Sequence, residues 1–414
     1  MPTTSTLAAI LSGGAGGDLY VPSLFTRYNA SGLWIPSFTH HSTDFNLVNA
    51  YQDNEGTTDA DADSDPVGLV LDESQGAAIG AELVTNGTFD ADTTGWVGYG
   101  ATGEGGATLS VVSQTMKCEN NGVGFGNADA VITVEDGSWY KIVASLKELN
   151  ALTSANLRCF TSTNTNGTAL GLNDGITVGD GHVLFFKASG TTAYITLQNG
   201  QNTDEAFARW DDVTCQKVSG NHAYQSTDAS RLTLVNDAGP GSNRWAAQGD
   251  GSAGHLVTGL KPATSMTMIV ACEFTGVGGG EIVIGSIAGS GARSYIGTDN
   301  SPAGHLGVGL GTKSWNDINL GVDVIGVPGV VAFRYTPSAY RLSWLPFGDS
   351  EVSVSGAHSE TLNTTVALAL MADNNDGAIG SHTAGYIFAA FAIQAALTDA
   401  EIAAISNVMS RAGV

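Results

Sequence analysis

Short apolar runs, in which hydrophobic and polar positions often alternate, fill the sequence between about residue 79 and residue 219. They include Thr108–Val112, Ala130–Val134, Trp139–Ala144 and Thr192–Leu197, and Gly, Asn, Asp or Ser separates most of them. A period of two places alternate side chains on opposite faces of a strand, so the runs are typical of β-strands with one buried face. At this spacing the pattern predicts a β-sandwich over residues 79–219.

A second β-rich pattern covers residues 220–414. Its strongest apolar runs are Met266–Ala271, Glu281–Ile284, Gly329–Tyr335 and Tyr386–Phe391. These runs are short and rich in β-branched and aromatic residues, which favours strands over helices. We therefore expect a second sandwich here, and an all-β chain with two sandwich domains.

The pattern changes near the C-terminus. Thr398 and Glu401 have the spacing of a capping box, in which each side chain accepts a hydrogen bond from the backbone amide of the other residue. An apolar stripe with helical spacing follows: Ile402, Ile405 and Val408 or Met409. We expect one short helix that begins at this box and packs on the second sandwich.

Residues 1–78 contain little apolar sequence from which to build a core. The segment carries one basic residue, Arg27, against ten acidic residues, and aspartates alternate with small residues from Asp59 to Asp65. Such self-repelling runs usually form solvated loops. A calcium loop is the alternative, but Val67 stands where an EF-hand requires an oxygen side chain, and Ser74 stands where it requires a glutamate. We expect an extended segment that becomes ordered on the following domain or on a partner.

The composition supports this organisation and excludes one class of function. The chain has 55 Gly and 42% hydrophobic residues, which favours folded β-structure with many tight turns over disorder. Its formal net charge is −24, with only 16 Lys and Arg residues. Because nucleic-acid affinity comes largely from Lys and Arg contacts to phosphate, we expect no nucleic-acid binding.

Cysteine spacing and hydropathy indicate the compartment. The four cysteines lie far apart with no C-x-x-C pair: Cys118, Cys159, Cys215 and Cys272. We therefore expect buried thiols, and neither a zinc site nor a dense disulfide framework. The first apolar run, Leu7–Leu11, has no basic residue before it, which is unlike a signal peptide. No stretch of about 18 apolar residues occurs, so we expect no membrane insertion and synthesis in a cytoplasm.

The sequence gives weaker signals for catalytic and ligand-binding residues. The motifs G-x-S-x-G, H-E-x-x-H and G-x-x-x-x-G-K-[ST] are absent, which favours a binding protein over an enzyme. A polysaccharide depolymerase stays open, because it needs only two carboxylates that no linear motif reveals. Sugar binding needs aromatic faces beside hydrogen-bonding groups. The candidate carbohydrate-binding residues are Tyr99 in a glycine-rich stretch, Trp139 on a strand, and Trp210.

Two strings near the ends of the first sandwich resemble those of carbohydrate-binding modules with a jelly-roll fold. The opening string is Glu82–Asp90 followed by Thr94–Trp96, and the closing string is Arg209–Thr214. In such modules the first and last strands meet, and acids there help to hold a structural calcium ion. The resemblance implies three calcium ligands: Asp90, Asp211 and Asp212. The alternative is that these acids only solvate a strand end, since adjacent strand residues point to opposite faces.

The second sandwich resembles the laminin-G-like or concanavalin-like domains of phage proteins. His222–Ser226 leads into Ser230–Leu234, and Leu397–Ile402 resembles the helix start that closes many such domains. Upstream, Pro66–Gln75 resembles a segment that often precedes these modules in phage and prophage proteins. The order of these parts is similar to that of a phage virion accessory protein.

The resemblance implies a protein of the virion surface, made in the host cytoplasm, such as a head spike, head fibre or tail-associated receptor binder. It implies binding of host-surface polysaccharide and assembly into a homo-oligomer. The expected domains are an anchoring segment that contacts other virion proteins (1–78), a carbohydrate-binding-module-like jelly roll (79–219) and a concanavalin-like or laminin-G-like sandwich (220–414). A purely structural capsid or tail decoration protein is the alternative, and a depolymerase is another.

Overall fold

The computed structural model describes residues 31–34, 50–72, 79–100, 103–104, 106–122, 124–163, 166–236, 245–276, 280–289, 291–300, 303–313 and 317–412. The chain divides into two compact units: sandwich 1 (Asn54–Thr57 and Ala78–Ser219) and sandwich 2 (Met1–Asp53, Thr58–Ala77 and Gly220–Val414). Strands make up 55% and helix 4% of the residues that the structure describes, which confirms the all-β class with a short C-terminal helix. No helix in these described ranges is long and apolar enough to span a membrane.

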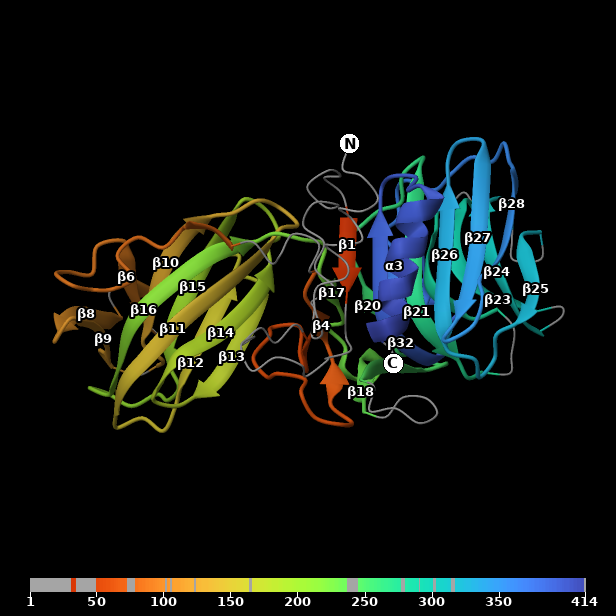
Figure 1. The fold of residues 1–414 in the computed structure, drawn as a ribbon. Helices are drawn as coiled ribbons and strands as arrows, with labels where there is room; N and C mark the ends of the chain where they lie inside the picture. Colours follow the sequence, from red (N-terminus) through yellow and green to blue (C-terminus); the bar gives the residue numbers. More distant parts are fainter. Residues whose placement is uncertain are drawn as a thin grey trace. The chain divides into compact units, whose positions relative to one another are not determined.

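Sandwich 1 consists of two antiparallel sheets (Figure 1). Sheet 1a has the order β13 (Ala169–Ile176), β12 (Ala155–Phe160), β15 (Thr192–Asn199), β10 (Asn127–Thr133), β6 (Trp96–Gly100), β7 (Gly103–Glu104). Sheet 1b has the order β14 (Gly179–Lys187), β11 (Trp139–Asn150), β16 (Phe207–Val218), β9 (Thr115–Asn120), β8 (Ala107–Val112), and β5 (Ile79–Glu82) also pairs with β16.

Apolar side chains at alternate positions of the strands fill the space between these two sheets. Ala128, Ala130 and Ile132 of β10 are buried in this core, as are Ile195 and Leu197 of β15. Burial of apolar surface stabilises a fold by roughly 25 cal/mol per Å². The period of two seen in the sequence therefore places the core of sandwich 1.

A bulge interrupts β16 where the two ends of sandwich 1 meet. Asp212 has a φ of 51°, and β16 pairs with β9 before this point and with β5 after it. The amide of Val213 donates to the carbonyl oxygen of Gly87 at 2.9 Å. A Cβ on Gly87 would lie 1.9 Å from the carbonyl oxygen of Val213, so the contact requires glycine. The opening and closing strings of the sequence are therefore in contact.

Sandwich 2 also has two sheets. Sheet 2a has the order β28 (Val352–Ala357), β27 (Ala339–Pro346), β26 (Gly329–Tyr335), β21 (Met266–Phe274), β32 (Ala384–Ile393), β19 (Ala246–Asp250), β18 (Leu232–Val235), β3 (Pro66–Val67), and β1 (Ser31–Trp34) also pairs with β32. Sheet 2b has the order β2 (Ala50–Tyr51), β4 (Leu69–Val70), β17 (Ala223–Tyr224), β20 (Leu256–Val257), β29 (Ala369–Leu370), β22 (Ile282–Ile287), β23 (Arg293–Asn300), β24 (Ala303–Gly311), β25 (Asn319–Asp323). The hairpin of β30 (Asp373–Asn375) and β31 (Ala378–Gly380) joins it at β22.

Strands from residues 1–78 belong to sandwich 2. β3 pairs with β18, β4 pairs with β2 and β17, and β1 pairs with residues 390–393 of β32. Val67 and Val70 are fully buried in the core of this sandwich. The described strands of the segment thus gain their order by completing the sheets of sandwich 2. The anchoring role of residues 1–78 stays a prediction.

The acidic run from Asp59 to Asp65 forms a loop that is largely exposed. Asp65 Oδ2 accepts the amides of Asp61 and Ala62 at 3.1 and 2.9 Å. Asp63 Oδ1 accepts the amide of Asn236 at 2.9 Å, just after β18. These carboxylates close the turn and fasten it to the end of β18.

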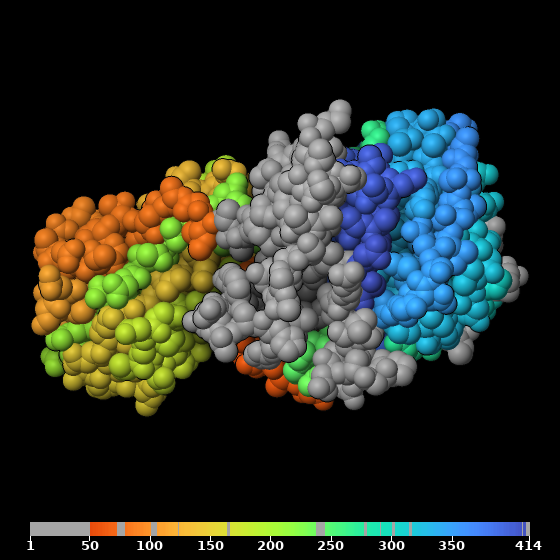
Figure 2. Space-filling model, in the orientation of Figure 1, coloured from red at the N-terminus to blue at the C-terminus, as the bar shows by residue number. Residues whose placement is uncertain are grey.

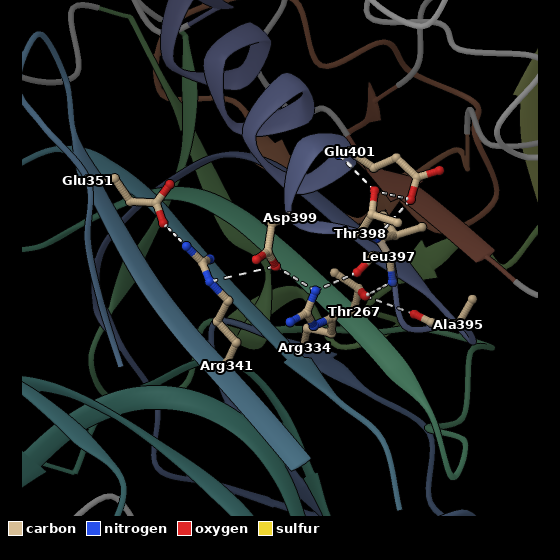
Figure 3. Close-up of polar contacts among 9 residues, drawn as sticks. All are labelled: Thr267, Arg334, Arg341, Glu351, Ala395, Leu397, Thr398, Asp399 and Glu401. Atoms are coloured by element: carbon tan, nitrogen blue, oxygen red, sulfur yellow. Dashed lines mark hydrogen bonds and ion pairs between the residues drawn. The ribbon is translucent and has the colours of Figure 1, made fainter. Parts of the chain in front are cut away.

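Helix α3 (Asp399–Ala412) covers the outward face of sheet 2a (Figure 1). In the space-filling view the dark blue surface of the helix adjoins the lighter blue surface of β26 and β27 (Figure 2). Its predicted capping box is confirmed, since the amide of Thr398 donates to Glu401 Oε2 at 2.8 Å and the amide of Glu401 donates to Thr398 Oγ1 at 3.3 Å (Figure 3). The apolar stripe packs as expected. Ile402, Ile405 and Met409 are buried against Ile269, Ala271, Val330, Ala332, Phe388 and Phe391.

Polar contacts fix the start of α3 on the sheet (Figure 3). Arg334 of β26 donates to the carbonyl oxygen of Leu397 at 2.8 Å and to Asp399 Oδ1 at 2.6 Å. Thr267 of β21 donates through Oγ1 to the carbonyl oxygen of Ala395 at 2.8 Å and accepts the amide of Leu397 at 3.0 Å. These contacts set the point at which the chain leaves β32 and enters the helix.

Candidate functional site

The outward face of sheet 1a carries polar and aromatic side chains in rows across the strands. Because the core residues of β10, β12 and β15 alternate with these positions, the row residues point away from the core. The register gives a first row of Tyr99, Asn127, Gln198 and Asn156. It gives a second row of Val97, Asp129, Thr196, Arg158 and Leu172, and a third of Val131, Tyr194 and Phe160. These three rows are called the polar face.

Five polar side chains of these rows are buried although they point away from the core. Thr196 is 0% exposed, Asn127 2%, Asp129 3%, Gln198 5% and Asn156 7%. Burying amide, hydroxyl or carboxylate groups costs free energy unless hydrogen bonds replace those to water. A face that needed only solubility would carry exposed charges at these positions. The composition of the polar face therefore points to a role beyond folding.

Hydrogen bonds hold several of these side chains in place. Asn156 Nδ2 donates to Gln198 Oε1 at 2.9 Å, and the amide of Gly175 donates to Asn156 Oδ1 at 3.0 Å. Arg158 donates to both carboxylate oxygens of Asp174, at 2.5 and 2.6 Å. Side chains fixed in this way lose little conformational freedom when a ligand binds.

Thr196 lies in the middle of the second row. Its Oγ1 is buried and forms no hydrogen bond within the part of the chain that the structure describes. Tyr99 and Tyr194 are half-buried nearby, while Val97 and Val131 are 40% and 61% exposed. Aromatic and apolar groups can stack on sugar rings, and amides and hydroxyls can bond to sugar hydroxyls. The polar face is therefore the candidate binding site of sandwich 1.

One of the three aromatic residues predicted to bind carbohydrate lies on the polar face. This is Tyr99, whose role stays a prediction. Trp210 is 0% exposed in the core of sandwich 1, and Trp139 is 5% exposed. Neither Trp139 nor its neighbour Tyr140, which stacks on Phe186 with ring centroids 5.3 Å apart, faces solvent. A buried ring has no face to offer a pyranose, so the structure corrects the expectation for Trp139 and Trp210.

Sequence reasoning missed the amide, hydroxyl and carboxylate groups of the polar face. Asn127 and Asp129 alternate with alanines, and Thr196 and Gln198 flank Leu197, so the pattern by itself indicates only strands. The available signal is the kind of polar residue. Short amides and hydroxyls stand at positions where a strand facing water often carries charged side chains.

The predicted metal ligands lie at the bulge of β16. Asp211 Oδ1 is buried and forms no hydrogen bond among the residues described. Burial raises the pKa of Asp211, the backbone amide of Asp212 opposes this rise, and the charges of Asp212 and Asp90 add to it. Asp90 is therefore near enough to act electrostatically on Asp211.

Asp212 turns towards a lysine. Lys147 Nζ lies 3.2 Å from Asp212 Oδ2 and 2.6 Å from Asp180 Oδ1. Across the described ranges, no group of three or more His, Cys, Asp or Glu side chains is arranged to hold a metal ion. Calcium takes about six to eight oxygen ligands, so a fit here needs Asp211, Asp90 and backbone carbonyl oxygens. Asp212, already paired with Lys147, does not fit this set.

Glu281 of sandwich 2 has a shifted carboxyl group. Its Oε2 is buried without a hydrogen bond in the described structure, and burial raises its pKa to about 7, which the amide of Ala384 opposes. A carboxyl group that titrates near neutral pH suits general acid catalysis. Glycoside hydrolysis also needs a second carboxylate about 5 to 10 Å away. No other carboxylate contributes to the raised pKa of Glu281, so this pKa gives no sign of a catalytic pair of carboxylates.

No protein-family model and no curated protein sequence matches this chain. Among solved structures, a CBM4 carbohydrate-binding module is 18% identical over 32% of this chain and 99% of that chain, with a TM-score of 0.26. Tailspike protein 4 of bacteriophage CBA120 is 17% identical over 33% of this chain and 21% of that chain, with a TM-score of 0.23. Tail fibre protein gp63.1 of an E. coli phage is 8% identical over 73% of this chain and 40% of that chain, with a TM-score of 0.23. This chain thus spans less than half of either phage protein, and scores this low assign no function.

Proposed function

We propose that this chain is a phage virion surface protein that binds host-surface carbohydrate through the polar face of sheet 1a. The observation that carries the proposal is the set of buried amide, hydroxyl and carboxylate side chains on that face, beside half-buried tyrosines. The resemblance of Glu82–Asp90 and Arg209–Thr214 to the ends of carbohydrate-binding modules supports the same function.

The layout of the polar face suits a glycan that crosses the strands. Neighbouring strands lie about 4.8 Å apart, so the four strands of the first row span roughly 15 Å. Tyr99, at one end of this row, stacks on a sugar ring. The partly exposed Arg158 and Tyr194 of the neighbouring rows then exchange hydrogen bonds with hydroxyl groups along the chain of sugars, and the buried Asn127, Gln198 and Asn156 hold the shape of the face. The face offers room for more than one ring.

The place on a virion is supported by sequence resemblance, above all that of Pro66–Gln75 to a segment of phage and prophage proteins. In this proposal residues 1–78 contact other virion proteins, and several copies present weak sites together, which raises avidity. Because β3 and β4 complete sandwich 2, the informative truncation removes only residues 1–30. If particles incorporate the shortened chain to the same extent as the full chain, residues 1–30 do not contain the anchor.

A structural calcium ion is a separate part of the proposal. Asp211, with its buried and unbonded Oδ1, and Asp90 are the residues that would hold it, and the ion would neutralise both carboxylates. Excess calcium is then expected to raise the melting temperature of the wild type and to leave that of Asp211→Asn unchanged. Equal shifts in the two proteins would remove the ion from the proposal.

A glycan array with the full chain tests carbohydrate binding. The double variant Asn156→Ala/Gln198→Ala is expected to lose the signal that the wild type gives. Gln216→Ala is the matched control, since it removes an amide from β16 in sheet 1b. Equal binding by the double variant would reject the polar face as the site. A wild type that binds no glycan would favour the purely structural decoration protein.

Polysaccharide hydrolysis is a second candidate function, favoured by the raised pKa of Glu281. Incubating the chain with host capsular polysaccharide and measuring chain length tests it. Shortening that disappears in Glu281→Gln would support a depolymerase. Unchanged chain length with a polysaccharide that the protein binds would leave binding as the function.

A further inference from the structure

The free edge of sheet 2a is unusual for an exposed strand. β28 pairs with β27 on one side, and no other described strand pairs with it (Figure 1). Its 6 residues contain no charge and no proline, and most are exposed. The register with β27 runs without a bulge from Ala357 opposite Ala339 to Val352 opposite Trp344. Regular, uncharged, exposed edges tend to pair with further strands.

Other sheet edges in the described structure are protected. β2, β3 and β7 have 2 residues each, and β13 and β25 have shifted registers. The edge of β14 is closed where the amide of Phe185 donates to the carbonyl oxygen of Glu55 at 2.6 Å. β8 is regular and uncharged, but Gly98 of β6 lies against the carbonyl of Ala107, and Leu109 packs on the core. β28 lacks these protections.

The hydrogen bonding beside β28 shows which of its backbone groups face outward. The amide of His358 donates to the carbonyl oxygen of Ser338 at 3.0 Å, in the same register as the β27–β28 ladder. Bonded and non-bonded pairs alternate in an antiparallel ladder, so Gly356, Val354 and Val352 direct their backbone groups at β27. The residues between them direct theirs away from it: Ser353, Ser355 and Ala357.

We propose that two copies of this chain associate edge to edge through β28, antiparallel about a two-fold axis at Ser355. Sheet 2a then continues into the second copy. Ser355 lies opposite Ser355 of the partner subunit, and Ser353 lies opposite Ala357 of the partner subunit. Each outward amide and carbonyl gains a hydrogen-bond partner in this register. The association does not depend on carbohydrate binding.

Self-pairing fits the strand for reasons of symmetry and charge. A two-fold contact must be complementary to itself, and a strand paired antiparallel with its own copy meets this condition. The net charge of −24 makes most faces of two copies repel each other. β28 brings only Val, Ser, Gly and Ala into the contact, so the pairing sets no like charges directly against each other.

Single cysteine variants test the register. The four native cysteines are buried and free, so a thiol added on β28 is the exposed one. In a bonded antiparallel pair the Cα atoms lie about 5.5 Å apart, within the span of a disulfide. Ser355→Cys is therefore expected to form a covalent dimer under mild oxidation. Ser353→Cys is the matched control, because the same residue of the partner subunit is offset by four positions, about 13 Å along the strand.

Light scattering of the full chain across a concentration series tests the association itself. The wild type is expected to shift from monomer to dimer as concentration rises. Ser355→Pro removes an amide that points outward and leaves all the amides that bond to β27. The variant should therefore raise the dimer dissociation constant about tenfold or more and keep the melting temperature unchanged. Ser355→Thr keeps the amide and should dimerise as the wild type does. A wild type that stays monomeric, or equal cross-linking of Ser353→Cys and Ser355→Cys, would overturn the proposal.

Discussion

Two outward sheet faces of this chain differ in the residues that alternate with their cores. In sheet 2a most outward positions of β21, β26 and β32 are apolar and α3 covers them, while Thr267 and Arg334 bind the start of the helix. In sheet 1a most outward positions of β10, β12 and β15 carry amide, hydroxyl, carboxylate or guanidinium groups, and Val131 and Phe160 are the apolar exceptions. Both faces come from strands with the same period of two and with apolar inward residues.

The difference separates a structural face from a candidate binding face. An apolar outward face has to be removed from water, and a helix with a matching apolar stripe does so. A face of fixed polar groups costs free energy where those groups are buried, and a ligand that bonds to them can recover part of that cost. Stability should therefore depend on the outward face of sheet 2a, and binding on that of sheet 1a.

The strongest effect is expected on the helix-covered face. Ile402→Ala removes a side chain that is 1% exposed between α3 and sheet 2a. The free energy of unfolding should fall by about 2 to 5 kcal/mol, because the variant loses apolar burial and leaves a cavity. Urea denaturation measures this change. Asn407→Ala, at an exposed position of α3, is the control and should change it by less than about 0.5 kcal/mol. Similar values for both variants would mean that α3 does not stabilise sheet 2a.

On the polar face we expect a substitution to lower glycan affinity and to leave stability almost unchanged. Asn156→Leu/Gln198→Leu removes both partners of a buried hydrogen bond and keeps the approximate side-chain volume. Replacing both partners by apolar groups is often neutral for stability, and the amide of the exposed Gly175, which loses Asn156 Oδ1, can bond to water, so the midpoint of denaturation should change little. Glycan affinity should fall at least about tenfold, or about 1.4 kcal/mol, in titration calorimetry. Loss of stability with retained affinity would make this face structural and erase the contrast with sheet 2a.

A smaller effect is expected at the start of α3. Thr398→Ala removes the hydroxyl that accepts the amide of Glu401. Loss of an N-cap costs about 1 kcal/mol, so the melting temperature of sandwich 2 should fall by a few degrees. Thr398→Ser keeps a capping hydroxyl and should restore most of the loss. Calorimetry of the two variants checks this, and an equal loss in both would assign the effect to the methyl group.

An effect of a different kind, which appears only as the pH changes, is expected in sandwich 2. Burial raises the pKa of Glu281 from 4.5 to about 7, so the folded state holds this proton more tightly than the unfolded state does. Stability from this group is therefore present below its unfolded pKa and is lost as pH rises through the folded value. Glu281→Gln should have a higher melting temperature than the wild type above pH 7, and the gap should shrink by pH 4. A gap that is constant with pH would contradict the shift.

Local patterns in the sequence predicted much of the fold and little of the site. Thr398 and Glu401 revealed the start of α3 because a capping box involves residues only three positions apart. The burial of Trp139 and Trp210 could not be read in this way, since it depends on which strands lie beside them. The same holds for Val67 and Val70, which fill sandwich 2 although they precede sandwich 1 in the sequence.

The all-β class, the turns between strands and the terminal helix can be read from the amino-acid sequence, because they depend on periodicity and on near neighbours. Strand pairing in three dimensions brought Asn156, Thr196 and Asn127 onto one face, where β12, β15 and β10 align residues far apart in the chain. It also left β28 with an open edge. Strand order and register set both features, and these follow from the packing of whole sheets rather than from any local motif.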